Sequence, residues 1–469
     1  MKRFVYCIAT AALLLGSAAA RAQTTTFTVG GTTVSVSPLA SNLSVPWELV
    51  WGPDNFIWMT ERNGRISRVN PDTGEVLPLL TVPDVAQTGE SGLLGLALHP
   101  DFAASPYLYI VYNYREGNDL KEKLVRYTYA ASTRTLSSPL VLLGNITANT
   151  THSGSRLLIL PDRTLLMTTG DAQLRPEAQN SSSLNGKILR LNLDGTVPSN
   201  NPTPGSLVYS LGHRNPQGLT RASNGKIYSS EHGETTDDEI NLIEAGRNYG
   251  WPSVEGLCNL PAEQTFCAAN NVRQPLRTWT PTIATAGLIH YDHPAIPEWR
   301  NSLLMVALKA TRLVQMPLTS ATDDIGTENT YLTTFGRLRA ICVSPQGKIY
   351  VGTSNRDGRN SNPPATDDRI LVLENRAYLP ASTASASKAA KLSVWPNPAQ
   401  GTVTLRLPSA PAAPVQATIL DALGRVARTT YFASGQADLQ LTLAGLTPGI
   451  YAIRALSGTS FYTQQLVVR

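Results

Sequence analysis

Hydrophobic and polar positions alternate in short runs along most of the chain, and each run follows a turn rich in Pro, Asp, Asn or Gly. Four such runs are "WGPDNFIWMTERNGRISRVNPDTGE" (51–75), "ILPDRTLLMTTGD" (159–171), "RASNGKIYSSEHG" (221–233) and "VSPQGKIYVGTSN" (343–355). A period of two predicts strands, and the turns predict hairpins. Because a single blade cannot bury both of its faces, repeated hairpins indicate a radially repeated sheet. We expect an all-β fold dominated by a six-bladed β-propeller.

The pattern changes near the C-terminus. Residues 379–391, "LPASTASASKAAK", have no apolar period and predict a linker, with a long loop as the alternative. Residues 392–469 return to alternating strands separated by turn sequences such as "NPAQG" and "TPGIY". This periodicity predicts a small β-sandwich, which we expect to lack catalytic function because it contains no His or Cys.

The first residues predict export. Residues 1–22 combine Lys2 and Arg3 with an apolar run and small residues at Ala20 and Ala22, as a secretory signal peptide does. The apolar run is too short to anchor the protein, and no later segment is long enough to cross a bilayer. We therefore expect a mature propeller at 23–378 that passes through the periplasm and is then secreted or attached to the cell surface.

Composition and cysteine spacing limit the classes of protein to which this chain could belong. Charged residues make up 16% of the 469 residues, while 35 Gly and 32 Pro suit many short strands. The net charge of +5 comes without basic runs, so we expect no nucleic-acid partner. Cys258 and Cys267 predict a disulfide in an oxidising compartment, with two free thiols as the alternative, whereas Cys342 in "RAICVSP" predicts a buried core residue.

Two groups of side chains could carry chemistry. His152 precedes one predicted strand and Asp171 follows the next, so a carboxylate could orient the ring as a general base; a purely structural hydrogen bond is the alternative. Arg214, in "LGHRNPQGL" (211–219), forms a candidate cationic group with Lys309, Arg337 and Arg339. Parallel guanidiniums suit an anion or paired carboxylates, and ordinary ion pairs with Asp or Glu are the alternative.

A third candidate site is acidic. In the segment "SEHGETTDDEINLIEAGRNYGWP" (230–252), acidic residues crowd at Glu231, Glu234, Asp237, Asp238 and Glu239. Oxygen ligands around a turn suit calcium, although the spacing is not that of an EF-hand loop. A solvated acidic loop is the alternative.

The propeller resembles the soluble pyrroloquinoline-quinone (PQQ) glucose and aldose sugar dehydrogenases. The matching stretches include "GESGLLGLALHPDF" (89–102), "GKILRLNLDGTVPSNNP" (186–202), "GHRNPQG", "DDEINLIEAGRNYGWP", "LKATRL" and "FGRLRA", in order over about 340 residues. The tail is similar to the sorting domain of type IX secretion cargo, through "WPNPA" (395–399), "DALGR" (421–425) and "LTPGIY" (446–451). These resemblances imply PQQ and calcium as cofactors and the type IX machinery as a partner.

The resemblance also implies residue roles. His152 would take the proton of the sugar's anomeric hydroxyl, Asp171 would orient it, and Arg214 would stabilise charge on the quinone. Its cofactor-binding positions are Arg214, Asn215, Lys309, Arg337 and Arg339, and Glu90 falls where the family faces the sugar. Its metal positions are the carbonyls of Gly233 and Glu234 for a catalytic calcium, and Glu239 with the carbonyl of Tyr249 for a structural one.

Some positions depart from the family pattern. Thr151 stands where the glucose enzyme has a sugar-binding aspartate, and the segment after Asp171 lacks a clear counterpart of the family's glutamine. Trp279 is the candidate for the aromatic wall over the cofactor, with Thr280 as the alternative in register. The shorter loops favour the broad aldose-oxidising subgroup.

The expected function is oxidation of aldose sugars to lactones, with an external quinone, cytochrome or dye as electron acceptor. A non-catalytic propeller that binds glycans or a protein is the first alternative. A calcium-dependent lactone hydrolase is the second, but such a site would ligate its metal with Asp, Asn and Glu side chains, whereas this chain offers a cationic group.

Overall fold

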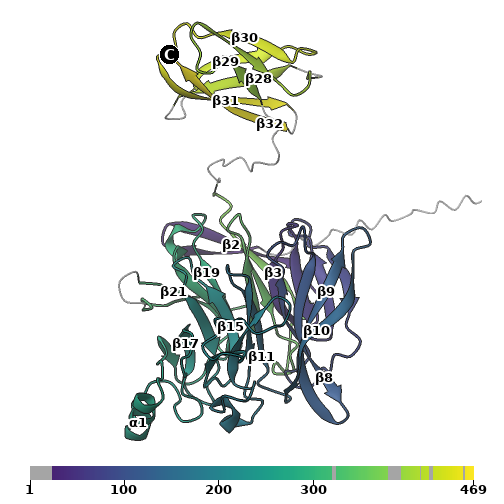
Figure 1. Cartoon of the computed structure of the whole chain (residues 1–469), viewed down its shortest axis with the longest axis vertical. Helices are drawn as coiled ribbons and strands as arrows, with labels where there is room; N and C mark the ends of the chain where they lie inside the picture. Colours follow the sequence, from purple (N-terminus) through teal and green to yellow (C-terminus); the bar gives the residue numbers. More distant parts are fainter. Residues whose placement is uncertain (1–23, 320–323, 379–391, 412–413, 422–425, 458–459) are drawn as a thin grey trace, which may run out of the picture. The chain divides into compact units, whose positions relative to one another are not determined.

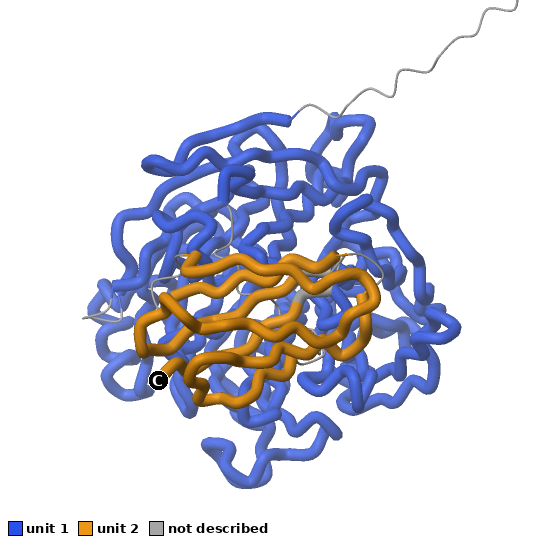
Figure 2. The backbone as a smooth tube through the Cα atoms, turned by 90° about the horizontal axis from the view of Figure 1, so that it is seen from above, with its two compact units in different colours: residues 1–378 blue, residues 379–469 orange. Residues whose placement is uncertain are grey.

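Strands make up most of the secondary structure, as the alternation of apolar and polar residues predicts (Figure 1). The computed structural model describes residues 24–319, 324–378, 392–411, 414–421, 426–457 and 460–469. The predicted signal peptide (1–22) and linker (379–391) lie outside the described residues. The chain divides into two compact units, residues 1–378 and 379–469 (Figure 2).

The first unit contains six antiparallel sheets, which are the blades of a propeller. Blade one comprises β3 (Pro46–Trp51), β4 (Ile57–Glu61), β5 (Arg65–Val69) and β6 (Val76–Thr81). Blade two comprises β7 (Leu93–Leu98), β8 (Tyr107–Glu116), β9 (Asp119–Ala130) and β10 (Thr135–Thr147). Blade three comprises β11 (Gly154–Ile159), β12 (Thr164–Thr169), β13 (Lys187–Asn192) and β14 (Val208–Leu211).

The other three blades follow in chain order. Blade four comprises β15 (Pro216–Arg221), β16 (Ile227–Glu231), β17 (Asp238–Ile243) and β18 (Arg277–Trp279). Blade five comprises β19 (Thr285–Tyr291), β20 (Ser302–Ala307), β21 (Arg312–Pro317) and β22 (Asn329–Tyr331). Blade six comprises β23 (Leu338–Val343), β24 (Ile349–Thr353), β25 (Ile370–Glu374), β2 (Thr32–Ala40) and β1 (Thr25–Val29).

The blades close into a ring. The first strand of each blade contacts the first strand of the next, and β23 contacts β3 to complete the circle. Blade six joins the two ends of the propeller segment, because β2 pairs with β25 in a register that sets Ser35 opposite Glu374. Pairing distant parts of the chain in one sheet prevents the ring from opening at its seam. The prediction of six blades is confirmed.

Apolar side chains between blades form the core, which the ring needs because each sheet is buried on both faces. Trp58 of blade one packs edge-on against Phe102 and Tyr129 of blade two, with ring centroids 5.4 and 5.0 Å away. Tyr291 and Trp299 make a similar edge-on contact at 6.2 Å. Burial of such rings contributes about 2 kcal/mol each.

Helical segments are few in the described residues: α1 (Pro261–Ala269) and the 3-10 turns η1 (Arg175–Ala178) and η2 (Pro297–Trp299). Cys258 and Cys267 form the predicted disulfide, with their Cα atoms 6.6 Å apart, and it ties α1 to the preceding loop. Cys342 is a buried free thiol on β23, as predicted. Both cysteine predictions are confirmed.

The second unit consists of two antiparallel sheets. One contains β26 (Ser393–Trp395), β27 (Thr402–Arg406) and β30 (Asp438–Thr442); the other contains β28 (Val415–Leu420), β29 (Val426–Phe432), β31 (Gly449–Ser457) and β32 (Ser460–Val468). Phe432, Ile419 and Ile453 are fully buried in its core. The unit is the expected β-sandwich. In the described part of the chain, no helix is both long and apolar enough to cross a membrane.

Candidate active site

Chain direction brings distant polar residues to one end of the propeller. The first and second strands of each blade are antiparallel, so the start of the first and the end of the second lie at the same end. In blade three, Gly154 on β11 pairs with Thr169 on β12. His152, just before β11, therefore lies beside Asp171, just after β12. Equivalent positions in the other blades supply the rest of the site.

A pocket of about 380 Å³ lies at this end. Eight of the predicted site residues line it: Glu90, His152, Arg214, Gly233, Glu234, Lys309, Arg337 and Arg339. The other four, Asp171, Asn215, Glu239 and Tyr249, lie behind its wall. Sequence reasoning missed Gln217, His232 and Arg359, which also line the pocket.

His152 and Asp171 form a direct hydrogen bond. The Nδ1 atom of His152 lies 2.7 Å from Oδ1 of Asp171, whose side chain is fully buried. Burial opposes ionisation of Asp171, but hydrogen bonds from His152, the Gln173 amide and the Trp251 indole outweigh it and hold its pKa below the usual value. An ionised Asp171 accepts the Nδ1 proton, which leaves Nε2 of His152 as a hydrogen-bond acceptor.

The backbone around His152 is tightly packed. His152 has φ of 60°, in the left-handed region, so the backbone turns sharply before β11. A Cβ atom at Gly170 would lie 1.8 Å from the carbonyl oxygen of His152, so this position requires glycine. The "TTGD" sequence therefore lets the two hairpin ends approach closely enough for His152 to reach Asp171.

The three polar side chains of the loop "LGHRNPQGL" make different contacts. His213 is fully buried and bonds Ser210 and Glu231 through its two ring nitrogens, at 2.9 Å each, so it supports the loop from behind. Arg214 lines the pocket, and its Nε has no hydrogen-bond partner among the described residues. Asn215 accepts the amide of Gly154 at 3.1 Å, while its Nδ2 is buried and equally unpartnered.

The two arginines of "FGRLR" share one carboxylate. Nε of Arg337 donates to Oδ2 of Asp357 at 2.8 Å, and a guanidinium nitrogen of Arg339 lies 4.0 Å from the same oxygen. Burial lowers the pKa of Arg339 to about 10, with Asp357 acting in the opposite direction. Although burial favours protonation of Asp357, the two arginines keep its pKa below the usual value. The two arginines thus form the ion pairs that the sequence analysis gave as the alternative. Their partner, Asp357, could not be identified from the sequence.

Other charged residues complete the rim. Lys309 donates to Thr282 at 3.0 Å. Arg359 pairs with Glu90 at 2.7 Å. Burial favours protonation of Glu90, but His232, Arg339 and Arg359 hold its pKa below the usual value. The pocket therefore presents mainly cationic and hydrogen-bonding groups.

His232 is the histidine that the sequence did not single out. Its Nε2 lies 2.5 Å from the carbonyl oxygen of Thr285, which accepts the hydrogen bond. Burial lowers the pKa of His232, while Asp238 and Glu90 act in the opposite direction. Its position after β16, equivalent to that of Asp171 after β12, is the signal that could have identified it.

Much of the acidic segment is buried, so the alternative of a solvated loop is wrong for its central residues. Asp238 is fully buried and accepts the amides of Gly233 at 2.9 Å and Ile283 at 2.7 Å. Glu231 accepts from His213 and from the backbone of Arg214. No hydrogen bond within the described residues ends on the carbonyl oxygens of Gly233 or Glu234.

A small cavity lies behind the pocket. Glu239 and Tyr249 line it together with Glu231, Asp237 and Glu255. Burial, reinforced by Glu231, raises the pKa of Glu239 well above its usual value. The described residues contain no group of three or more His, Cys, Asp or Glu that could hold a metal.

Trp279 does not form the expected aromatic wall. Its ring is buried in the core between blades four and five, and its indole nitrogen donates to Glu328 at 3.1 Å. Thr280 contacts Asp237 at 3.2 Å. Trp279 therefore faces the core and does not line the pocket.

A buried acid supports the His152 segment and gives a testable pH dependence. Glu122 accepts from Ser155 at 2.9 Å, and burial raises its pKa to about 8. An unfolded carboxyl ionises near 4.5, so between about pH 4.5 and 8 the folded state binds more protons and stability falls as pH rises. One proton gives a slope of at most about 1.4 kcal/mol per pH unit. We expect Glu122→Gln to flatten this slope, measured by urea unfolding from pH 5 to 9.

The exposed residue Glu116 provides the matched control for that measurement. Glu116→Gln removes a carboxyl from the neighbouring strand without removing a buried one, so its slope should match that of the parent protein. Equal slopes for Glu122→Gln and the parent would contradict the assignment.

Comparisons with known proteins agree with this architecture. The glucose/sorbosone dehydrogenase family pattern matches residues 43–362, and the secretion system C-terminal sorting domain pattern matches residues 393–469. The second match indicates export through the type IX system. Quinoprotein glucose dehydrogenase B of Acinetobacter calcoaceticus is 43% identical over 249 residues, which cover 46% of this chain and 52% of that protein. The chain thus matches about half the length of that relative.

Two further relatives align over more of their length. An aldose sugar dehydrogenase of Escherichia coli is 31% identical over 352 residues, covering 70% of this chain and 91% of that protein. The PQQ-bound aldose sugar dehydrogenase of Streptomyces coelicolor is 34% identical, with a TM-score of 0.64 over 73% of this chain and 98% of that one. The family match spans more than half of the chain and coincides with the propeller that carries the pocket, so this protein belongs to the glucose/sorbosone dehydrogenase family of oxidoreductases.

Proposed function

We propose that the propeller is a PQQ- and calcium-dependent dehydrogenase that oxidises aldose sugars at the anomeric carbon to lactones. The observation that carries the proposal is that a histidine oriented by a buried aspartate faces the same pocket as a group of cations. A base beside anion-binding residues is what removal of a hydroxyl proton next to an anionic cofactor requires.

The residues present fit PQQ. The cofactor is planar and carries three carboxylates, and the pocket offers Arg214, Lys309, Arg337 and Arg339 on three different blades. Two buried donors lack hydrogen-bond partners among the described residues: Nε of Arg214, which lines the pocket, and Nδ2 of Asn215, which lies behind its wall. Unpartnered buried donors are costly, which favours a ligand that accepts from them. When bound, PQQ would accept the hydride from the sugar carbon.

The chain's own residues would prepare the sugar for that transfer. Nε2 of His152 accepts the proton of the anomeric hydroxyl, and the ionised Asp171 stabilises the imidazolium that results. Arg214 would provide positive charge in the same pocket, where negative charge develops. Glu90, held by Arg359, supplies an acceptor for a sugar hydroxyl. Deprotonation and charge stabilisation would thus come from different side chains of one pocket.

Calcium fits two places. The free carbonyls of Gly233 and Glu234 would hold a catalytic calcium ion at the pocket. Its positive charge would stabilise negative charge that develops on an oxygen atom bound there. Glu239 and the Tyr249 carbonyl would hold a structural ion in the small cavity. This second ion would stabilise the ionised carboxylate of Glu239, which burial otherwise favours in its protonated form.

Removal of the structural calcium should destabilise the propeller. At a free calcium concentration of a hundred times Kd, one site contributes about 2.7 kcal/mol. We expect calcium to raise the melting temperature of the parent protein and Glu239→Gln to lose most of that increase, as measured by calorimetry with calcium or a chelator. Glu116→Gln, at an exposed position on β8, is the matched control. An unchanged response in Glu239→Gln would remove this residue from the ligand set.

The direct test of function is a titration of the purified protein with PQQ and calcium, followed by a panel of aldoses with a dye as electron acceptor. Turnover that requires both additions supports the proposal and identifies the preferred sugar. PQQ binding without turnover on any aldose would reject the substrate class. Absence of PQQ binding would favour a propeller that binds glycans or a protein without catalysis.

The C-terminal unit suggests how the protein would be exported. We propose that the chain crosses the periplasm and that the sorting domain then directs it to secretion or attachment at the cell surface. A reporter fused to the sorting domain should reach the medium or the surface only when residues 392–469 are present. Retention of the reporter inside the cell would contradict this route.

A further inference from the structure

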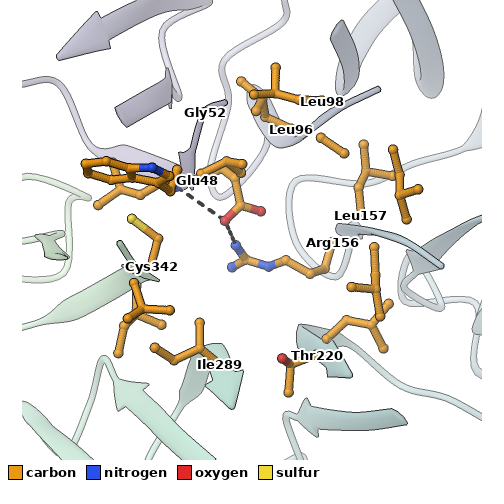
Figure 3. A pocket seen from close by; sticks show the side chains of 18 of the residues that line it. Glu48, Gly52, Leu96, Leu98, Arg156, Leu157, Thr220, Ile289 and Cys342 are labelled. Carbon is orange, nitrogen blue, oxygen red and sulfur yellow. Dashed lines mark hydrogen bonds and ion pairs between the residues drawn. The ribbon is translucent and has the colours of Figure 1, made fainter. Parts of the chain in front are cut away.

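A second, larger pocket opens at the other end of the propeller channel (Figure 3). The inner strands begin at the active-site end, so their last residues, such as Trp51 on β3 and Leu98 on β7, lie at the opposite end. The cavity measures about 660 Å³, within the range of ligand sites, and its walls are mainly Leu, Ile and Val side chains. Nothing in the proposed sugar oxidation uses this space.

A buried ion pair lies among these apolar walls, and the polar residues Asn55, His99 and Thr220 also line the pocket. Arg156 of β11 and Glu48 of β3 form a buried ion pair, and their side chains are only 5% and 6% exposed (Figure 3). The guanidinium also donates from Nε to the carbonyl of Gln217 at 2.9 Å. Its remaining nitrogen, Nη2, is buried and has no partner among the described residues. Among the described residues, Nη2 of Arg156 is therefore a buried cationic donor that a ligand in this pocket could satisfy.

The charges of Arg156 and Glu48 indicate that the ligand of this pocket would be neutral. Glu48 neutralises Arg156, and burial raises the pKa of Glu48 while Arg156 opposes that effect. A ligand carboxylate in this pocket would lie near the negative charge of Glu48, and no unpaired cation would balance it. Removing that carboxylate from water would therefore be costly. A neutral carbonyl oxygen can accept from Nη2 at much lower cost. The Trp51 ring at the rim and the aliphatic walls favour an apolar or aromatic body.

The two pockets are separated by a polar layer. Gln217 presents its side chain to the active-site pocket, where Oε1 accepts from Arg339 at 3.3 Å, while its backbone carbonyl holds Arg156 on the other side. We propose that the apolar end of the channel is a separate binding site for a neutral, largely apolar molecule with one carbonyl acceptor, an aryl ketone or a quinone being examples of this chemistry. The site does not depend on the proposed sugar oxidation.

Three naphthalene probes of similar shape test the proposal on the full-length protein. Equilibrium dialysis should show 2-acetylnaphthalene, a ketone, binding about tenfold more tightly than 2-ethylnaphthalene, because only the ketone accepts from Arg156. The carboxylate 2-naphthoate should bind more weakly than the ketone. Equal binding of the ketone and the hydrocarbon, or preferred binding of the carboxylate, would overturn the proposed ligand class.

Variants locate the site. Ile289→Trp on β19 and Leu98→Trp on β7 each fill the cavity from a different blade and should reduce ketone binding at least tenfold. Leu140→Trp adds the same ring at an exposed position on β10 outside the pocket and should have no effect. Saturating PQQ should not displace the ketone. Displacement by PQQ, or unchanged binding in both filled variants, would place the probe elsewhere and reject the site.

Discussion

Replacing the candidate base is expected to reduce turnover by about 10²–10⁴-fold, the usual contribution of a positioned general base. His152→Gln keeps a side chain of similar length but cannot take up the hydroxyl proton. Because His152 lies outside the cationic group, PQQ affinity should change little. Steady-state kinetics with an aldose and a dye acceptor, combined with a PQQ titration, measure both quantities.

Two comparisons make the first prediction specific. His293→Gln, a histidine outside the active-site pocket, should leave the rate unchanged. Asp171→Asn should lower kcat and alter its pH profile, because it removes the charge that orients His152 and stabilises the imidazolium. Loss of PQQ binding in His152→Gln, or a rate within a factor of a few of the parent, would reject His152 as the base.

Removing the paired guanidiniums is expected to weaken PQQ binding by at least about 100-fold, since each charge-assisted hydrogen bond contributes about 1.5–3 kcal/mol. The change is Arg337→Ala with Arg339→Ala. Asp357→Asn is added so that no buried carboxylate is left without its partners. Titration with PQQ at constant calcium gives the affinity.

The matched control removes two arginines elsewhere. Arg300→Ala with Arg376→Ala deletes the same charge from exposed positions outside the active-site pocket and should leave PQQ affinity unchanged. Asp357→Asn alone reports the effect of the competing carboxylate. If the triple variant binds PQQ as tightly as the parent, the cationic group holds something other than the cofactor.

Blade architecture could be predicted from the sequence because its causes are local. Alternation of apolar and polar residues, and turn formers such as those before Gly64 and Gly347, specify hairpins within a few residues. The same locality explains why the Cys258–Cys267 pair could be predicted from its short spacing. Motif matches located the residues that reach the active-site pocket, since they stand at strand ends.

Electrostatic partners could not be predicted in this way. Asp357 pairs with both Arg337 and Arg339. Arg359, between β24 and β25 of blade six, pairs with Glu90, which precedes β7 of blade two. Trp279 shows the same limit, because one strand position decides whether a ring faces the channel or the core. These contacts depend on how the blades are arranged around the ring, which no local pattern contains.

The sequence by itself determined the all-β class, the six blades, the sandwich and the residue types of the active-site pocket. Tertiary structure alone decided which of them meet: it joined His152 to Asp171, buried His213 behind the pocket and placed Arg156 against Glu48 at the far end of the channel. The physical reason is that strand periodicity arises between neighbouring residues. A pocket at the axis of a ring arises only when all six blades close and bring their strand ends together.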